Sequence, residues 1–347
     1  MDYLVDLGGT PQWAARDPSS CGGFPQAAIC TSPPANLDDW IDYVTAVVSR
    51  YKGRIQYYEL WNEPNTRHFW TGSYADMVEL ARSAYTIIKT IDPDALVLTP
   101  APTGPVHPVR PGSGFIASAP DWMATYLRAG GAEFADIGAW HGYIGRTGTT
   151  PYPMPEQDAT PGCAPEDCYG SINRKIELMR ATFDANGMGS KPMFDTEGGW
   201  GVTTNLNPAD QPGWLARWYL LQASSYATDN LQRVYWFAWG GPVGGQPWGT
   251  LEDSSGAPNA AGIAANQVYD WLVGAAFTQP CAGVADGLWT CGLTLANGRQ
   301  AVVVWSAGGA SSYSPSSGAA QYRDLAGNTT PVRGPITVGA RPVLVES

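Results

Sequence analysis

The sequence predicts an α/β protein whose parallel sheet is followed by a small antiparallel β-domain. Short β-branched or aromatic runs alternate with amphipathic stretches up to about residue 274, which is the pattern of strands joined by helical crossovers. Beyond that point the helical periodicity stops, and Gly and Ser dominate between short strands. The length of 347 residues fits one large α/β unit or a barrel with a small appendage.

Six strands and six helices are expected in the α/β part. The strands are predicted at 3–7, 55–61, 95–99, 135–140, 192–196 and 233–239. The helices are predicted at 37–51, 74–90, 121–129, 172–185, 214–227 and 260–273. The first helix illustrates the reasoning, because Leu37, Trp40, Ile41 and Val44 have the i, i+3, i+4, i+7 spacing of a helix packed on one face. Asn36 is its expected N-cap.

The C-terminal part is expected to contain strands at 288–293, 300–306, 321–324 and 343–345, with a loop at 307–318. We therefore divide the chain into a (β/α) catalytic domain at 1–274 and a β-sandwich-like domain at 275–347. No internal repeat of fixed period is present.

Composition and charge exclude several classes of protein. The formal net charge is -11 and no run of Lys or Arg occurs, which disfavours a nucleic-acid or membrane-surface partner. No apolar stretch is long enough to span a bilayer. Three scattered histidines argue against a catalytic metal, and no cofactor motif is found. The 15 Trp and 17 Tyr, against 8 Phe, suit a protein that stacks aromatic rings on sugars.

The six cysteines form three close pairs in loop-like sequence. They are expected to make disulfides and so indicate an oxidising, extracellular compartment, with reduced structural cysteines as the alternative. The pairs are Cys21 with Cys30, Cys163 with Cys168, and Cys281 with Cys291. The first residues have neither the basic nor the apolar region of a signal peptide, so a secreted protein would need a targeting segment outside this sequence.

Candidate catalytic groups stand where two predicted strands end. Asn62 and Glu63 follow an apolar run, would be costly to bury there, and precede a strand-stopping Pro64. Glu197 ends a later strand and precedes a Gly pair that allows close approach of a ligand. In an α/β barrel such ends meet at the active-site mouth. Two carboxylates facing one cleft are what cleavage of a glycosidic bond requires.

The run Glu59-Leu-Trp-Asn-Glu-Pro-Asn65, followed by Phe69-Trp70, resembles the fourth-strand signature of glycoside hydrolase clan A, and is closest to families 39 and 5. The resemblance implies that Glu63 is the acid/base and that Asn62 binds the 2-hydroxyl of the sugar. Glu197, in Thr-Glu-Gly, is similar to the nucleophile of the seventh strand.

Weaker matches extend the resemblance over most of residues 1–274. The run 140–143 is similar to the sixth-strand His-x-Tyr, whose Tyr contacts the nucleophile, and the run 7–13 resembles the end of the third strand. Trp236 and Trp239 lie where, in the family, a Trp of the eighth strand forms the bottom of the sugar subsite. Trp200, in a Gly-rich loop, is a further candidate for stacking on a sugar. The substrate-binding residues expected in all are Asn62, Trp13, Trp70, His141, Tyr143, Trp200, Trp236 and Trp239.

If the strands are matched to the family in this way, the first predicted strand of this chain corresponds to the third strand of the family. The chain then contains about six βα units of a TIM-type barrel, and six strands cannot close an eight-stranded barrel. Either the sequence is a fragment or the barrel is incomplete. The open edges would then be covered by self-association, another partner, the C-terminal domain or rearranged loops.

The predicted activity is that of a retaining β-glycoside hydrolase acting on a plant or microbial polysaccharide or oligosaccharide. Double displacement places the two carboxyl groups about 5–5.5 Å apart. A catalytically impaired carbohydrate-binding protein is one alternative, distinguished by measuring sugar release against binding. A transglycosylase is another, distinguished by its products at high acceptor concentration. The sequence does not identify the sugar, or endo against exo action.

Overall fold

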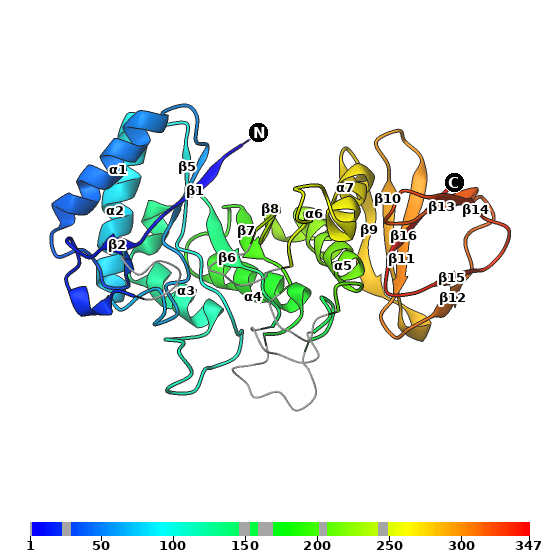
Figure 1. Cartoon of the computed structure of the whole chain (residues 1–347), viewed down its shortest axis with the longest axis horizontal. Helices are drawn as coiled ribbons and strands as arrows, with labels where there is room; N and C mark the ends of the chain where they lie inside the picture. The colour runs from blue at the N-terminus through cyan, green and yellow to red at the C-terminus, as the bar shows by residue number, and fades with distance from the viewer. Residues whose placement is uncertain (1, 23–28, 146–152, 159–168, 201–206, 242–248) are drawn as a thin grey trace. The chain divides into compact units, whose positions relative to one another are not determined.

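A computed structural model of the chain describes residues 2–22, 29–145, 153–158, 169–200, 207–241 and 249–347 (Figure 1). The chain divides into two compact units. The first comprises residues 1–143, 161–169 and 177–197, and the second comprises 144–160, 170–176 and 198–347. Within the described ranges, no helix is both long and apolar enough to cross a membrane.

The first unit is built on five parallel strands that follow one another in chain order. They are β1 (Leu4–Leu7), β4 (Tyr57–Leu60), β5 (Leu96–Leu98), β6 (Gly138–His141) and β7 (Met193–Gly198). β4 pairs in parallel with β1 and β5, and β6 pairs in parallel with β7. A parallel bridge between Leu98 and Ile137 connects β5 to the start of β6. The parallel arrangement expected from the sequence is therefore confirmed for these strands.

Helices α1 (Leu37–Tyr51), α2 (Tyr74–Ile91), α3 (Ala119–Arg128) and α4 (Ile172–Ala185) lie between the strands in sequence. The predicted cap is confirmed, because the Asn36 side chain accepts a hydrogen bond from the Asp38 amide at 3.1 Å. The buried stripe of α1 faces α2, where the Trp40 indole donates to the carbonyl of Leu80 at 3.0 Å. These contacts cap α1 and hold it against α2.

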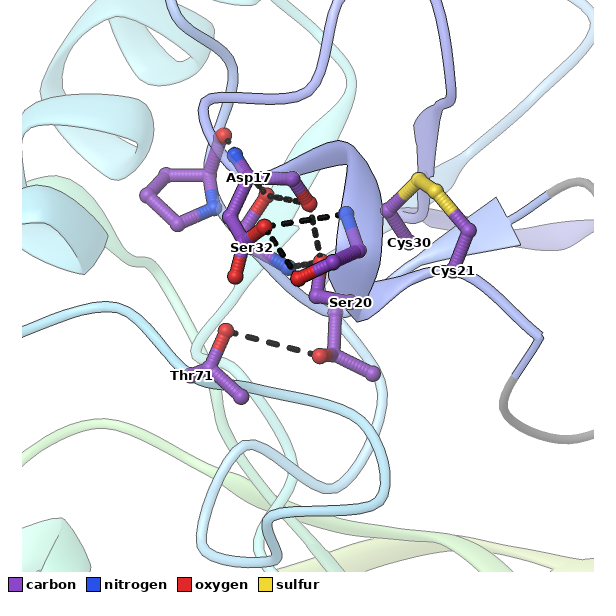
Figure 2. The surroundings of a disulfide bond; sticks show 9 residues. Asp17, Ser20, Cys21, Cys30, Ser32 and Thr71 are labelled. Carbon is purple, nitrogen blue, oxygen red and sulfur yellow. Dashed lines mark hydrogen bonds between the residues drawn. A yellow bond between two sulfur atoms is a disulfide. The ribbon is translucent and has the colours of Figure 1, made fainter.

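A short ribbon follows β1. It consists of β2 (Thr10–Pro11) paired antiparallel with β3 (Ile29–Cys30), and the disulfide Cys21–Cys30 ties it to a 3₁₀ turn at Pro18–Ser20 (Figure 2). Asp17 caps that turn through the Ser19 amide at 2.9 Å. The Ser32 hydroxyl accepts from the Asp17 amide at 3.1 Å. The predicted disulfide is therefore present, and polar contacts fix the backbone around it.

The second unit contains α5 (Gln211–Ser224), α6 (Tyr226–Asp229), β8 (Leu231–Trp236) and α7 (Ala260–Leu272). α5 is buried on nearly all sides, and the Trp214 indole donates to the carbonyl of Pro153 at 2.8 Å. The strand predicted at 233–239 is shifted, because β8 begins and ends earlier and leaves Trp239 outside it.

The C-terminal sheet of this unit has the strand order β14-β13-β16-β11-β10-β9, and β12 and β15 form a separate pair. Its members are β9 (Ala276–Gly283), β10 (Leu288–Thr294), β11 (Gln300–Ser306), β12 (Ser311–Tyr313), β13 (Gln321–Arg323), β14 (Thr329–Pro331), β15 (Ile336–Val338) and β16 (Val343–Glu346). All pairings in both sheets are antiparallel, as expected. A cluster of Leu288, Val304, Val338 and Val345 packs the two sheets together.

The C-terminal prediction is wrong for one loop and three strands. The stretch predicted as a loop contains β12, and β9, β14 and β15 were not predicted. The predicted disulfide Cys281–Cys291 is present, and it links β9 to β10. The expected pair Cys163 and Cys168 lies outside the described residues, and the domain boundary at 274/275 stays a prediction.

Candidate active site

The first candidate carboxylate follows β4 in a distorted stretch of backbone. Trp61 and Glu63 both have positive φ, 70° and 43°, a region that residues with a side chain rarely occupy. The Glu63 amide donates to the carbonyl of Ala101 at 3.0 Å, which ties the turn to the chain beyond β5. Such outliers persist only where the surroundings enforce them, and they gather at functional sites.

The Asn65 side chain ties the segment after this turn to the neighbouring loop, a role that was not expected from the sequence. It is fully buried and exchanges two hydrogen bonds with the Thr103 backbone, at 2.7 and 2.9 Å. A third bond runs to the carbonyl of Ala117 at 3.2 Å. Its position in the Trp-Asn-Glu-Pro-Asn run was the only signal in the sequence, because an Asn in a loop has no distinguishing periodicity.

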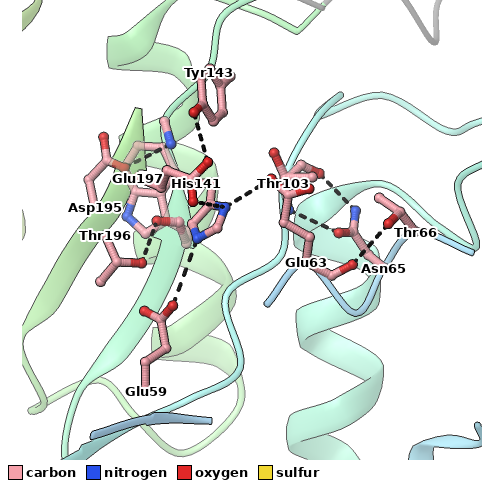
Figure 3. Close-up of polar contacts among 12 residues, drawn as sticks. Glu59, Glu63, Asn65, Thr66, Thr103, His141, Tyr143, Asp195, Thr196 and Glu197 are labelled. Carbon is pink, nitrogen blue, oxygen red and sulfur yellow. Dashed lines mark hydrogen bonds and ion pairs between the residues drawn. The ribbon is translucent and has the colours of Figure 1, made fainter. Parts of the chain in front are cut away.

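Glu197 reaches the same place from β7 through a β-bulge. Trp140 of β6 pairs with Asp195, but the next residue, His141, pairs with Glu197, so that Thr196 is the extra residue. A bulge of this kind changes the direction of the side chains beyond it. The Tyr143 hydroxyl then donates to Oε1 of Glu197 at 2.7 Å (Figure 3). Tyr143 thus contacts Glu197 in the way that the resemblance implied.

Asp195 shapes the turn that follows β6. It is fully buried, and its Oδ1 accepts from the Gly142 amide at 2.8 Å. A side chain at position 142 would collide with this carboxylate, so only Gly fits there. The buried carboxylate therefore fixes the backbone between His141 and Tyr143, which supports the neighbouring side chains.

His141 lies at the centre of the group. Its Nδ1 is 2.9 Å from Oε1 of Glu63 and 3.9 Å from Oε2 of Glu197, and its Nε2 is 3.8 Å from Oε1 of Glu59 (Figure 3). The imidazole is only 1% exposed, whereas the Glu63 and Glu197 side chains keep 14% and 24% of their surface exposed. Both glutamates can therefore be reached by a ligand, while the histidine stays behind them.

The carboxylates set the protonation of the group. Burial alone would lower the pKa of His141, but the charges of Glu197, Glu59 and Glu63 outweigh it and raise the pKa well above its ordinary value. Burial raises the pKa of Glu197 to about 7, against the opposing effects of His141 and the Tyr143 hydrogen bond. The protonation of His141 and that of Glu197 therefore depend on each other.

Asp6 on β1 also belongs to this electrostatic group, and the sequence had not singled it out. It pairs in register with Glu59 of β4. Desolvation by the surrounding protein and the Glu59 charge raise the pKa of Asp6 well above its usual range, although its side chain keeps access to water. Asp6 and Asn62 also line a cavity of about 50 Å³ beside Trp61.

The same three residues could in principle bind a cation. One ligand atom from each of Glu63, His141 and Glu197 lies within 4.8 Å of the others. The Nδ1–Oε1 contact of 2.9 Å is, however, the length of a hydrogen bond, and it occupies the nitrogen that a metal would need. The arrangement fits proton transfer better than metal coordination.

The predicted aromatic residues fall into two sets. In the first unit, Trp13 is 78% exposed and available to a ligand, but Trp70 is 1% exposed and packs edge-on against Trp61 at 4.8 Å. The expectation that Trp70 contacts substrate is therefore corrected, because its ring is enclosed by protein.

The other three tryptophans belong to the second unit. Trp239 is exposed at 54%, and Trp236 is partly buried, with its indole donating to the carbonyl of Gly249 at 2.9 Å. Trp200 is buried and packs edge-on against Trp214. Trp239 thus keeps a ring face available, whereas Trp200 serves packing.

Several solved structures that are similar to this chain in fold are described as glycoside hydrolases. A family 39 glycoside hydrolase from Bacteroides cellulosilyticus WH2 aligns with 100% of this chain and 68% of its own, at 20% identity and a TM-score of 0.69. For a monomeric β-xylosidase from Caulobacter crescentus CB15, the alignment covers 99% of this chain and 80% of the xylosidase, at 17% identity and a TM-score of 0.59. For the GH39 enzyme from Xanthomonas axonopodis pv. citri, the alignment covers 99% of this chain and 78% of that enzyme, at 16% identity and a TM-score of 0.60.

Comparisons of the sequence itself find no match, either among protein-family models or among curated proteins. The similarity to family 39 enzymes of clan A is therefore one of fold.

Proposed function

We propose that this chain hydrolyses β-glycosides with retention of configuration, with Glu197 as the nucleophile and Glu63 as the acid/base. The observation that carries the proposal is the separation of the two carboxylates, which have oxygens within 4.8 Å of each other although the residues are far apart in sequence. Retaining enzymes hold their carboxyl groups about 5–5.5 Å apart, whereas inverting enzymes leave about 6.5–9.5 Å for a water molecule.

The neighbouring contacts support these roles. The Tyr143 hydroxyl hydrogen-bonds Glu197 and favours its ionised form, which a nucleophile needs. His141 hydrogen-bonds Glu63 and can stabilise the carboxylate that remains once Glu63 has protonated the leaving oxygen. The same carboxylate can then take a proton from the water that releases the sugar from Glu197.

The substrate is proposed to be a plant or microbial polysaccharide or oligosaccharide. Asn62 and Tyr143 would meet the sugar undergoing attack, whereas His141, which was expected to bind substrate, lies behind the two glutamates and would act through Glu63. Trp13 and Trp239 have exposed rings on which sugars could stack. Two disulfides are consistent with secretion into an oxidising compartment.

The incomplete TIM-type barrel also remains a proposal. β1 stands at the end of the order β1-β4-β5, so its outer edge has no strand partner among the described residues. Parallel edges are normally paired or covered. Association with a second copy or another partner at this edge is testable by the oligomeric state in solution.

The proposal is tested by chemical rescue. Glu197→Gly should lose turnover of an aryl β-glycoside, and added azide should restore it with formation of a glycosyl azide. Glu63→Ala should also regain turnover with azide, but mainly on substrates whose leaving group needs no protonation. Glu133→Gln, an exposed carboxylate in a different part of the first unit, is the matched control and should leave turnover unchanged.

The anomer of the first product, followed by NMR, decides the stereochemistry. Release of the inverted anomer, or full activity of both variants, would refute the assignment. Binding of oligosaccharides without any release of reducing ends would leave a carbohydrate-binding protein instead.

A further inference from the structure

Glu59 is a buried carboxylate directly beneath the catalytic group, and the proposed reaction gives it no role. Only 4% of its side chain is exposed, and its Oε2 has no hydrogen-bond partner among the described residues. Its Oε1 is 3.8 Å from Nε2 of His141, which is an ion-pair distance and too long for a strong hydrogen bond. A buried carboxylate without a full set of hydrogen bonds is costly unless a positive charge faces it.

The two nitrogens of His141 face two different glutamates. Nδ1 faces Oε1 of Glu63 at 2.9 Å, and Nε2 faces Glu59 on the other side of the ring (Figure 3). A neutral imidazole has one N–H and one lone pair, so either tautomer would direct its lone pair at a carboxylate. A doubly protonated imidazole directs an N–H at each of them.

The remaining charges around His141 are negative as well. Glu197 of β7 lies 3.9 Å from Nδ1, and Asp6 of β1 interacts electrostatically with the same imidazole. Asp195 of β7 binds the Gly142 amide, next to the histidine along the chain. The segments of β1, β4 and β7 around His141 therefore present acids, whereas the chain after β5 contacts it through the carbonyl of Pro102, and the imidazole can balance this negative charge.

We propose that Glu59 is a positioning residue that keeps His141 doubly protonated, so that its Nδ1–H stays donated to Oε1 of Glu63. The imidazolium N–H engages one lone pair of Oε1, which favours Oε2 as the oxygen that carries the proton given to the leaving group. Glu59 thereby selects the oxygen of Glu63 that transfers the proton, without touching the substrate. This inference rests on the proposed function for its kinetic consequence, but the state of His141 can be measured without any substrate.

The direct test is the titration of His141 by NMR. The chain has three histidines, so protein labelled with ¹⁵N-histidine gives a simple spectrum, and His68→Gln and His107→Gln assign the third residue by elimination. In the unaltered protein, both ring nitrogens of His141 should have the chemical shifts of an imidazolium at pH 7. In Glu59→Gln, which keeps the shape and removes the charge, the midpoint should fall by about 1–3 pH units.

Asp92→Asn is the matched control, because Asp92 is another buried carboxylate of the first unit and binds the Gly53 amide at the opposite end of the strands. It should leave the His141 titration unchanged. Glu59→Asp restores the charge and should return most of the shift. If Glu59→Gln does not fold, the titration of His141 in the unaltered protein and in Glu59→Asp still tests the inference.

Kinetics give the second measurement. In Glu59→Gln the alkaline limb of kcat/KM should move to lower pH together with the His141 midpoint, and kcat should fall more than KM rises. A neutral His141 at pH 7 in the unaltered protein would overturn the inference, as would an unchanged midpoint in Glu59→Gln. Absence of all glycosidase turnover would instead contradict the proposed function, and the NMR result would stand separately.

Discussion

Replacing Tyr143 by Phe should shift the pH dependence of the proposed reaction. The hydroxyl donates to Oε1 of Glu197 at 2.7 Å and favours the ionised carboxylate, whose pKa is already raised to about 7. A hydrogen bond to a charged group contributes about 1.5–3 kcal/mol, and one pH unit corresponds to about 1.4 kcal/mol. Loss of the hydroxyl should therefore raise the pKa of Glu197 by about 1–2 units further.

The direction of the expected shift in the pH profile follows from the need for an ionised nucleophile. In the unaltered protein, kcat/KM should fall as the pH drops below about 7, because Glu197 becomes protonated. In Tyr143→Phe that limb should lie about 1–2 units higher, so that kcat/KM at pH 6 falls by about 10- to 100-fold while much of it returns at alkaline pH.

Initial rates on an aryl β-glycoside between pH 4 and 10 measure both limbs. Tyr126→Phe is the control, because the Tyr126 hydroxyl is buried in the first unit and has no hydrogen-bond partner among the described residues. Its profile should match that of the unaltered protein, and its Tm should be equal or higher, because a buried unpaired hydroxyl is lost. An acidic limb that stays in place, or moves downward, in Tyr143→Phe would refute the reasoning.

Three further predictions concern the framework. Asn65→Ala should lower the free energy of unfolding by about 2–5 kcal/mol in urea titrations, because buried backbone groups lose their partners. The kcat value should fall as well. A loss of stability below about 0.5 kcal/mol would contradict this. Gly142→Ala should reduce stability and activity together, since its methyl group collides with Asp195; normal Tm and kcat would show that the carboxylate can move. Replacing Cys281 and Cys291 by Ser should cost about 3 kcal/mol, measured by thermal unfolding, and dithiothreitol should reproduce the loss.

The sequence predicted most elements but not all of their ends, since α5 spans Gln211–Ser224 and not 214–227 as predicted. α1 and α4 have the predicted bounds, because their start signals and apolar spacing are local properties. β8 is shifted by two to three residues, since an aromatic run such as Tyr235–Trp239 favours strand along its whole length. The end of a strand depends on where its partner stops, and that partner is remote in sequence.

The sequence predicted which residues make up the candidate site, but not most of the contacts between them. Glu63, Glu197 and Tyr143 come together as the motifs indicated. The bulge at Thr196 could not be read from the sequence, because it depends on the register of two strands. Nor could the position of Glu59 beneath His141, since that contact joins two strands separated by about 80 residues.

The left-handed backbone at Trp61 and Glu63 has a consequence for the stability of the chain. A side chain in this conformation costs roughly 1–2 kcal/mol, and Gly would relieve that cost. Glu63→Gly should relieve this strain but also remove the hydrogen bond between Glu63 and His141, so the measured change in the free energy of unfolding is the difference between the two effects. Under the proposed function, the strained conformation of Glu63 is kept for its position beside His141 rather than for its contribution to stability.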